Sequence, residues 1–163
     1  MKRKHQVTLL SLVTAIGIAL LPFAIVKRSF KDWIIVYLVS AAGNLLADTY
    51  LVKKGFIQYK IRPFPDKFKI HLPFDLVHYP LLLLYYNQWA LNSRPLSQIF
   101  KVLLISLPQV MMETIAEKKT NLIAWSKGWT WYHSFFSMMG KFFICRLIIA
   151  FVRKINRERV SVT

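Results

Sequence analysis

The chain has 163 residues, of which 55% are hydrophobic and 15% aromatic, and its mean hydropathy is +0.39. This composition excludes a disordered chain, and its long apolar blocks exclude the interleaved pattern of a soluble domain. The 23 Lys and Arg residues against 7 Asp and Glu residues give a net charge of +16, which favours an anionic partner, either nucleic acid or anionic lipid. The single cysteine, Cys145, excludes an intramolecular disulfide. We therefore predict one membrane domain over residues 1–163, folded as an all-α bundle of about five transmembrane helices.

The first apolar block, residues 7–26, contains no charged residue. A helix of this length rises about 30 Å, at roughly 1.5 Å per residue, and so covers the hydrocarbon thickness of a bilayer. The basic start at residues 2–4 also fits a signal peptide, with Gly17 and Ala19 as the cleavage pair. The apolar run continues well past Ala19, which favours a retained membrane anchor.

Four further apolar blocks have the length of membrane spans. They cover residues 33–52, 74–92, 99–117 and 130–151. The block at 74–92 is the least regular because Pro80 falls in its first two turns, where a helix tolerates proline. Five spans place the two termini on opposite sides of the membrane. The N-terminus and the second and fourth loops carry twelve Lys and Arg residues against nine on the other side, so we expect this side, side A, to face the cytoplasm.

The second loop, residues 53–73, alternates basic residues with aromatic residues. Such a pattern suits either single-stranded nucleic acid, through stacking and phosphate contacts, or the headgroup level of a bilayer. Between two membrane spans the bilayer is the simpler partner, so we expect anionic lipid, and no nucleic acid, to bind here. The predicted headgroup contacts in this loop are Lys60, Arg62, Lys67 and Lys69.

Polar residues within the predicted spans form a second pattern. An ionisable residue at the centre of a membrane helix costs about 3 kcal/mol, so each one is a candidate functional residue. Spacings of three or four residues give each of the last four spans one polar stripe, and the acids and histidines lie toward side A. Because a polar stripe faces other helices or water, we expect the four stripes to meet in a common polar interior. Its predicted members are Asn44, Asp48, Asp75, His78, Gln109, Glu113, His133, Ser137 and Lys141.

Three interpretations of this polar interior are open. It is a satisfied hydrogen-bond network that fixes helix packing, a path for a proton or a solute, or a metal or hydrolytic site. The metal site would use Asp48, Asp75, His78, Glu113 and His133, whose spacing matches no known ligand motif. Within the interior we expect Glu113 to pair directly with Lys141, because both side chains lean toward a common depth.

A run of residues around the fourth loop resembles a known family. The run Glu113–Ile123 has an acid, three residues and a second acid, then Lys-x-Thr-Asn-Leu-Ile, and Gly128–His133 contains Trp-x-Trp-Tyr. These motifs resemble a family of small, roughly five-span membrane proteins of unknown function from spore-forming Gram-positive bacteria, and the similarity covers Trp33–Arg153. The resemblance implies a bacterial cytoplasmic membrane and a role in the sporulating cell, but no catalytic residues. The basic residues 2–4 are not part of the family pattern.

The same run also has a direct physical interpretation as the exit of a membrane helix. Lys118 and Lys119 lie where cations stabilise both a helix C-terminus and lipid headgroups, and the tryptophans that follow suit the membrane interface. The run then marks a well-anchored helical hairpin. The alternative is a headgroup-binding site in which Lys118, Lys119 and Trp125 hold an anionic lipid.

These observations favour a non-enzymatic scaffold or partner protein in the bacterial cell membrane, since 163 residues leave no separate soluble domain for catalysis. We expect no cofactor, and as partners either a second copy of the chain or another membrane protein. The second interpretation is a small transporter or channel subunit with a polar intramembrane path. The third is a metal-dependent membrane enzyme.

Overall fold

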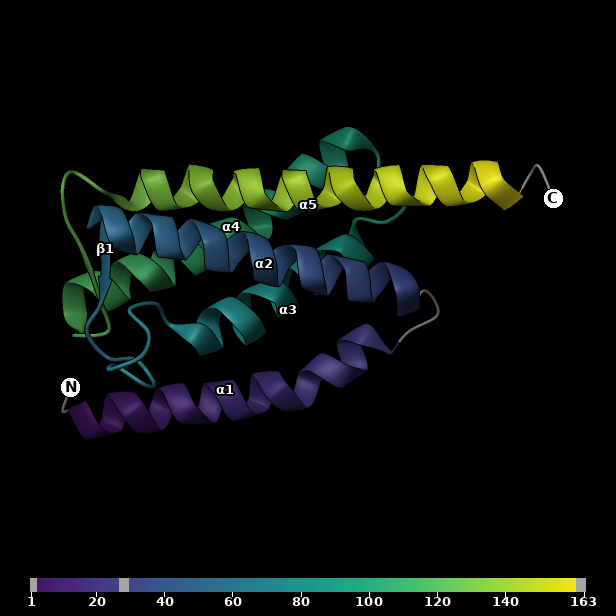
Figure 1. Ribbon diagram of the computed structural model, residues 1–163. Coiled ribbons are helices and arrows are strands. Elements are labelled where there is room, and N and C mark those ends of the chain that lie inside the picture. Colours follow the sequence, from purple (N-terminus) through teal and green to yellow (C-terminus); the bar gives the residue numbers. More distant parts are fainter. Residues whose placement is uncertain (1–2, 27–29, 161–163) are drawn as a thin grey trace.

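The computed structural model describes residues 3–26 and 30–160, so the basic residue Lys2 lies outside the described residues. The described residues are largely helical, as the composition predicts, and Figure 1 shows the helices packed as one bundle. The five α-helices are α1 Arg3–Ile25, α2 Phe30–Lys54, α3 Tyr79–Trp89, α4 Pro95–Lys119 and α5 Trp131–Val160. A π-helical turn, η1 Phe74–His78, leads directly into α3.

Two short strands join the connections at one end of the bundle. Strand β1, Ile57–Tyr59, follows α2, and strand β2, Ile123–Trp125, follows α4. They pair antiparallel with Gln58 opposite Ala124, so α2 and α4 must end at the same end of the bundle, which we call the ribbon end. Within the described residues the chain therefore passes five times between the ribbon end and the opposite, far end. The first turn of α1 and the last turns of α5 lie at opposite ends of the bundle (Figure 1).

Four helices are long and apolar enough to cross a membrane, namely α1, α2, α4 and α5. The predicted third span, 74–92, corresponds to η1 and α3, whose helical residues end at Trp89 and rise only about 24 Å. This shorter segment is the centre of the bundle and contacts each of the other four helices. Its core residues Leu83, Leu84 and Tyr86 are at most 1% exposed. The third apolar block is thus apolar because it is buried in protein.

The π-helical turn and a cross-helix hydrogen bond accommodate Pro80. Proline has no backbone N–H, so in α-helical register the carbonyl of Leu76 loses its usual donor. The Tyr37 hydroxyl of α2 donates to that carbonyl at 3.1 Å. Tyr79 in turn donates its backbone N–H to Phe74, five residues back, which is the π-helical pattern. The proline therefore fixes both the local geometry of η1 and its position against α2.

An apolar layer fills the middle of the bundle. We call Tyr79, Leu83, Tyr86 and Phe142 the aromatic layer, and each of these residues is at most 1% exposed. The rings of Tyr79 and Tyr86 meet Phe142 edge to face, with centroids 6.1 and 5.0 Å away. Such contacts contribute about 1 kcal/mol each beyond burial. Along both α3 and α5 this layer separates the polar residues of the ribbon end from those of the far end.

The outer surface of the bundle is apolar. On α4 an exposed stripe follows the spacing of one helix face, and its members are Phe100, Leu104, Leu107, Met111 and Ile115. A soluble bundle of this size would present charged and polar groups there, whereas lipid tails require this pattern. The outer surface agrees with the length and composition of the four long helices, and the fold has the features of a membrane protein.

Helix α1 approaches η1 closely at Gly17. A Cβ atom at this position would lie 2.8 Å from Cγ1 of Val77 and 3.2 Å from Cδ2 of His78. We expect Gly17→Ala to lower the free energy of unfolding by about 1–3 kcal/mol, because one of the helices must move. The matched control is Gly43→Ala, where nothing lies within 4 Å of the added atom. Alanine should stabilise that position slightly, and equal effects of the two variants in detergent thermal unfolding would contradict the close packing of α1.

Candidate functional site

Buried and half-buried polar side chains from four elements meet near the ribbon end. We call Asn44, Asp48, Tyr59, Asp75 and Lys141 the polar cluster. Asn44 donates through Nδ2 to Oδ1 of Asp75 at 2.6 Å, and its Oδ1 accepts from Nζ of Lys141 at 2.6 Å. The Tyr59 hydroxyl donates to Oδ2 of Asp48 at 2.5 Å. The cluster thus joins α2, β1, η1 and α5.

The polar cluster is shielded from the surroundings of the protein. Asp75 is 0% exposed, Asn44 1% and Asp48 5%. Asp75 is bound by Asn44, one helical turn before Asp48 on α2, so the two acids are neighbours in the cluster, and Oδ2 of Asp75 has no donor among the described residues. Lys141 also lies over the ring of Tyr79, with Nζ 4.8 Å from the centroid, which is a cation–π contact.

The polar stripe of α2 and the pairing of β1 with β2 build this cluster. Asn44 and Asp48 are four residues apart and therefore share the inner face of α2. Tyr59 is the last residue of β1, so strand pairing with Ile123 carries its side chain over the end of α2. Burial and then the neighbouring Asp48 carboxylate raise the pKa of Tyr59 well above its usual value. The Tyr59 hydroxyl therefore keeps its proton and acts as a donor.

Tyr59 is the cluster member that sequence reasoning missed, because the loop was expected to lie on lipid. The loop instead folds around Arg62, which donates to the carbonyls of Tyr59 at 2.5 Å, Phe68 at 2.7 Å and Pro65 at 3.3 Å. Arg62 is therefore engaged inside the loop. Among the other predicted headgroup contacts Trp125 is half-buried. The lysines are exposed, namely Lys60, Lys67, Lys69, Lys118 and Lys119.

The direct contact expected between Glu113 and Lys141 does not form. Glu113 accepts a hydrogen bond from the Ser134 hydroxyl at 3.0 Å, and Trp129 donates its indole N–H to that hydroxyl at 2.9 Å. Ser134 lies seven residues before Lys141 on α5, about 10 Å nearer the ribbon end, so it meets Glu113 first. Lys141 reaches across to Asn44 instead. Glu113 still attracts Lys141 at longer range, after Asp48 and Asp75.

The remaining predicted members of the polar interior lie elsewhere. His78 is beside Gly17 and contacts the backbone of Val13, so it faces α1. His133 contacts the Thr130 hydroxyl at 2.9 Å and stacks on Trp129. Gln109 and Ser137 are half-buried on α4 and α5. No three His, Cys, Asp or Glu side chains converge for a metal ion within residues 3–26 and 30–160.

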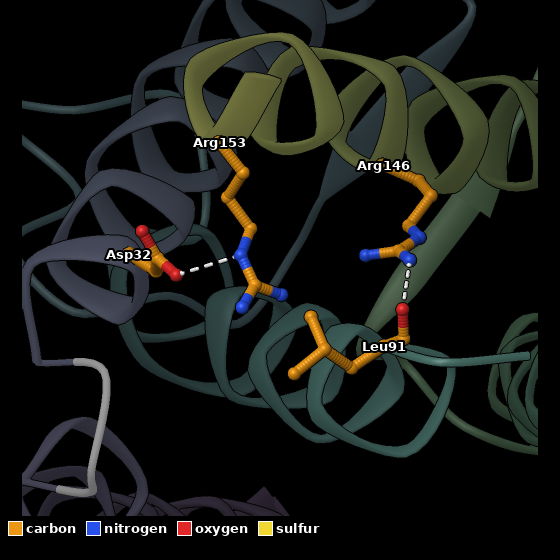
Figure 2. A network of polar contacts seen from close by, with 4 residues as sticks. All are labelled: Asp32, Leu91, Arg146 and Arg153. Atoms are coloured by element: carbon orange, nitrogen blue, oxygen red, sulfur yellow. Dashed lines mark hydrogen bonds and ion pairs between the residues drawn. The ribbon is translucent and has the colours of Figure 1, made fainter. Parts of the chain in front are cut away.

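A second polar region lies at the far end, where α3 ends inside the bundle. Asp32 of α2 pairs with Arg153 of α5 at 3.2 Å, and Arg146 donates to the Leu91 carbonyl at 2.7 Å (Figure 2). Arg146 also donates to Ala90 at 3.2 Å. Lys101 donates to the Trp89 carbonyl at 2.8 Å. Two cations thus satisfy the carbonyls that α3 leaves without partners and oppose the negative end of its dipole.

His71 closes the other end of the same segment. Its carbonyl accepts from the backbone N–H of Phe74 at 2.9 Å and of Asp75 at 3.2 Å, and its Nδ1 also accepts from Phe74, at 3.2 Å. This contact requires Nδ1 without a proton, so the proton of the neutral ring is on Nε2. Burial lowers the pKa of His71 from 6.5 to about 4.

The lowered pKa of His71 predicts acid sensitivity. The unfolded chain binds a proton at His71 below about pH 6.5 whereas the folded protein does not, so the stability present above that pH is lost as pH falls toward 4. The full loss is about 3 kcal/mol, at about 1.36 kcal/mol per pKa unit. His71→Asn keeps an acceptor for the Phe74 N–H without a titrating group, and it should flatten this part of the pH profile in detergent thermal unfolding. Parallel profiles of the two proteins would refute the assignment.

No family model, curated protein or solved structure matches the chain.

Proposed function

We propose that the protein is a multi-pass bacterial membrane protein that acts as a non-enzymatic scaffold or partner for other membrane proteins. In this proposal α1, α2, α4 and α5 cross the bilayer, and η1 with α3 completes a fifth passage inside the bundle. The lengths and apolar composition of the four long helices support the membrane location.

The observation that carries the proposal is the separation of the two polar regions. The polar cluster at the ribbon end and the cations at the far end are divided by the aromatic layer, whose residues are at most 1% exposed. Most polar groups on either side bond to protein, for example Lys141 to Asn44 and Arg146 to Leu91. In this proposal the two polar regions fix helix packing, and the closely packed side chains of the aromatic layer block a path between them.

A small transporter or channel subunit is the second candidate. Charged groups inside the bundle, such as the buried Asp48 and the half-buried Lys141, are the observation that favours it, because ionisable groups in membrane helices often mark ion pathways. Proteoliposomes containing a pH-sensitive dye test the two candidates. The scaffold proposal predicts proton and potassium leakage equal to that of protein-free liposomes. Leakage that the intact protein increases and Lys141→Met abolishes would favour transport.

The exposed stripe on α4 is the surface that we expect a partner helix to cover. Met111 of this stripe is 62% exposed, and methionine adapts readily to a partner surface. A photo-crosslinking residue at Met111 in native membranes should give one discrete protein adduct, either a dimer or a single second membrane protein. The matched control is Leu46 on α2, which is 73% exposed and should crosslink to lipid. Lipid adducts alone at both positions would contradict the scaffold proposal.

We also propose that the loop over residues 53–73 contacts anionic lipid. Replacing Lys60, Lys67 and Lys69 by Gln in the full chain should weaken association with vesicles that contain anionic lipid, by about 1 kcal/mol per lysine. Since Arg62 bonds to loop carbonyls, Arg62→Gln should instead lower loop stability. Added salt should reduce the difference between the wild-type and triple-variant proteins. A triple variant that distinguishes neutral from anionic lipid as well as the wild-type protein does would rule out this contact.

A further inference from the structure

The polar cluster has one acceptor more than its donors satisfy. Oδ1 of Asp75 accepts from Asn44 at 2.6 Å, but Oδ2 has no donor although the residue is 0% exposed. The Tyr59 hydroxyl donates to Asp48 and the Lys141 ammonium donates to Asn44, and no donor among the described residues reaches Oδ2 of Asp75. A buried carboxylate oxygen without a donor is strongly unfavourable. A donor is therefore missing between Asp75 and its neighbours.

The charges of the cluster are unbalanced in the same direction. If Asp48 and Asp75 were both ionised, these two acids and the single cation Lys141 would together carry a net charge of −1. The other groups that face them supply no positive charge: Asn44 of α2, Tyr59 of β1 and Tyr79 of α3 are neutral, and Glu113 of α4 is acidic. A buried net charge is expensive in the low-dielectric interior of a membrane protein.

One proton removes both defects. Asp48 and Asp75 are neighbours, because Asn44, one turn before Asp48 on the same face of α2, binds Asp75. Paired carboxylates in a dry site hold one proton between them. A proton on either carboxyl group supplies the missing donor. It also makes the group of Asp48, Asp75 and Lys141 electrically neutral.

We propose that Asp48 and Asp75 form a binding site for a single proton, which the two carboxyl groups share beside Lys141. The site is distinct from the scaffold role and stands whether or not that role is correct. Tyr59 contacts Asp48 from the ribbon end, and the aromatic layer closes the other side. The proton therefore comes from, and returns to, the water at the ribbon end. A multivalent metal does not fit, since no three suitable side chains converge in the described residues.

Infrared spectroscopy of the full-length protein in lipid nanodiscs tests the site directly, through the C=O stretch of a protonated carboxyl group. We expect this band at pH 7 in the wild-type protein. To separate the pair from Glu113, the variants are compared in the Glu113→Gln background, where the band should persist and where Asp48→Asn and Asp75→Asn should each remove it. In either variant one aspartate remains beside Lys141. The opposite charges of these two groups cancel, so the pair needs no added proton. The matched control, Asp66→Asn, changes an exposed loop acid and should leave the band unchanged. Lys141→Met should increase the band about twofold, because two acids without a cation need two protons.

Several results would overturn the proposal. A wild-type spectrum without a protonated-carboxyl band at pH 7 would overturn it, and this result does not depend on whether the variants fold. Loss of the whole band in Glu113→Gln would assign the proton to Glu113, and its persistence in folded Asp48→Asn and Asp75→Asn proteins of that background would exclude the pair. Displacement of the band by sodium chloride at constant pH would identify the ligand as a monovalent cation that competes with the proton.

Discussion

Lys141→Met is expected to lower the free energy of unfolding by about 3 kcal/mol at neutral pH. The ammonium group of Lys141 is the cation of the polar cluster. It donates to Asn44 at 2.6 Å and lies 4.8 Å from the Tyr79 ring centroid. Removing one partner of a buried charge group typically costs about 3–5 kcal/mol, and uptake of a second proton by the acids limits the loss here. Thermal unfolding in detergent measures the effect, which should decrease as pH falls and that proton binds.

A double-mutant cycle identifies the partner of Lys141. We expect Asp48 to couple to Lys141 more strongly than Glu113 does, because Lys141 donates to Asn44 of the Asp48 face of α2, whereas Glu113 accepts from Ser134. The combination of Lys141→Met with Asp48→Asn should therefore be clearly milder than the sum of the single effects. The same combination with Glu113→Gln should be closer to additive. A larger coupling to Glu113 than to Asp48 would restore the pairing that side-chain direction predicts from the sequence.

The difference between these two partners shows which information the sequence contains. Hydrophobic blocks locate helices well, because a helix that crosses a bilayer needs about twenty apolar residues. The blocks at 33–52 and 99–117 fall within α2 and α4, and the other three overrun the observed helices, most of all the block 74–92, whose helix ends at Trp89. Stripe spacing also groups Asn44 with Asp48 correctly on the inner face of α2. Neither pattern specifies which helix a stripe faces. The lean of the two side chains therefore predicts a pair of Lys141 with Glu113 on the neighbouring span, although Asn44 of α2 is the group that Lys141 contacts.

The ribbon end was less predictable still. Strands β1 and β2 are three residues each and lie more than sixty residues apart in the sequence, so no hydrophobic periodicity predicts them. Without that pairing the loop over residues 53–73 resembles a lipid-facing segment, and Tyr59 has no reason to enter the polar cluster. One signal was present in hindsight, since an isolated buried acid such as Asp48 requires a donor beyond its own helix. The sequence alone does not say which loop residue supplies it.

The far end gives the second large effect, since Arg146 holds the end of a helix that stops inside the bundle. Arg146 donates to the carbonyls of Leu91 at 2.7 Å and Ala90 at 3.2 Å, immediately after α3 ends at Trp89. Hydrogen bonds from charged donors contribute about 1.5–3 kcal/mol each, so Arg146→Met should lower the free energy of unfolding by about 3 kcal/mol. Arg146→Lys should recover only part of the loss, because an ammonium group lacks the planar fork of the guanidinium.

The matched control is Arg94→Met, which removes an exposed arginine at the start of α4 and should change stability by less than about 0.5 kcal/mol. Hydrogen exchange of the last turn of α3 supplies a local readout, since carbonyls without donors allow that turn to open. Faster exchange there in Arg146→Met, with the Asp48 end of the bundle unchanged, would show that the arginine acts on the helix end itself. If Arg146→Met were as stable as Arg94→Met, Lys101 alone would satisfy the end of α3 through the Trp89 carbonyl. The two cations would then be redundant, and the short central helix would depend on its apolar packing for its position.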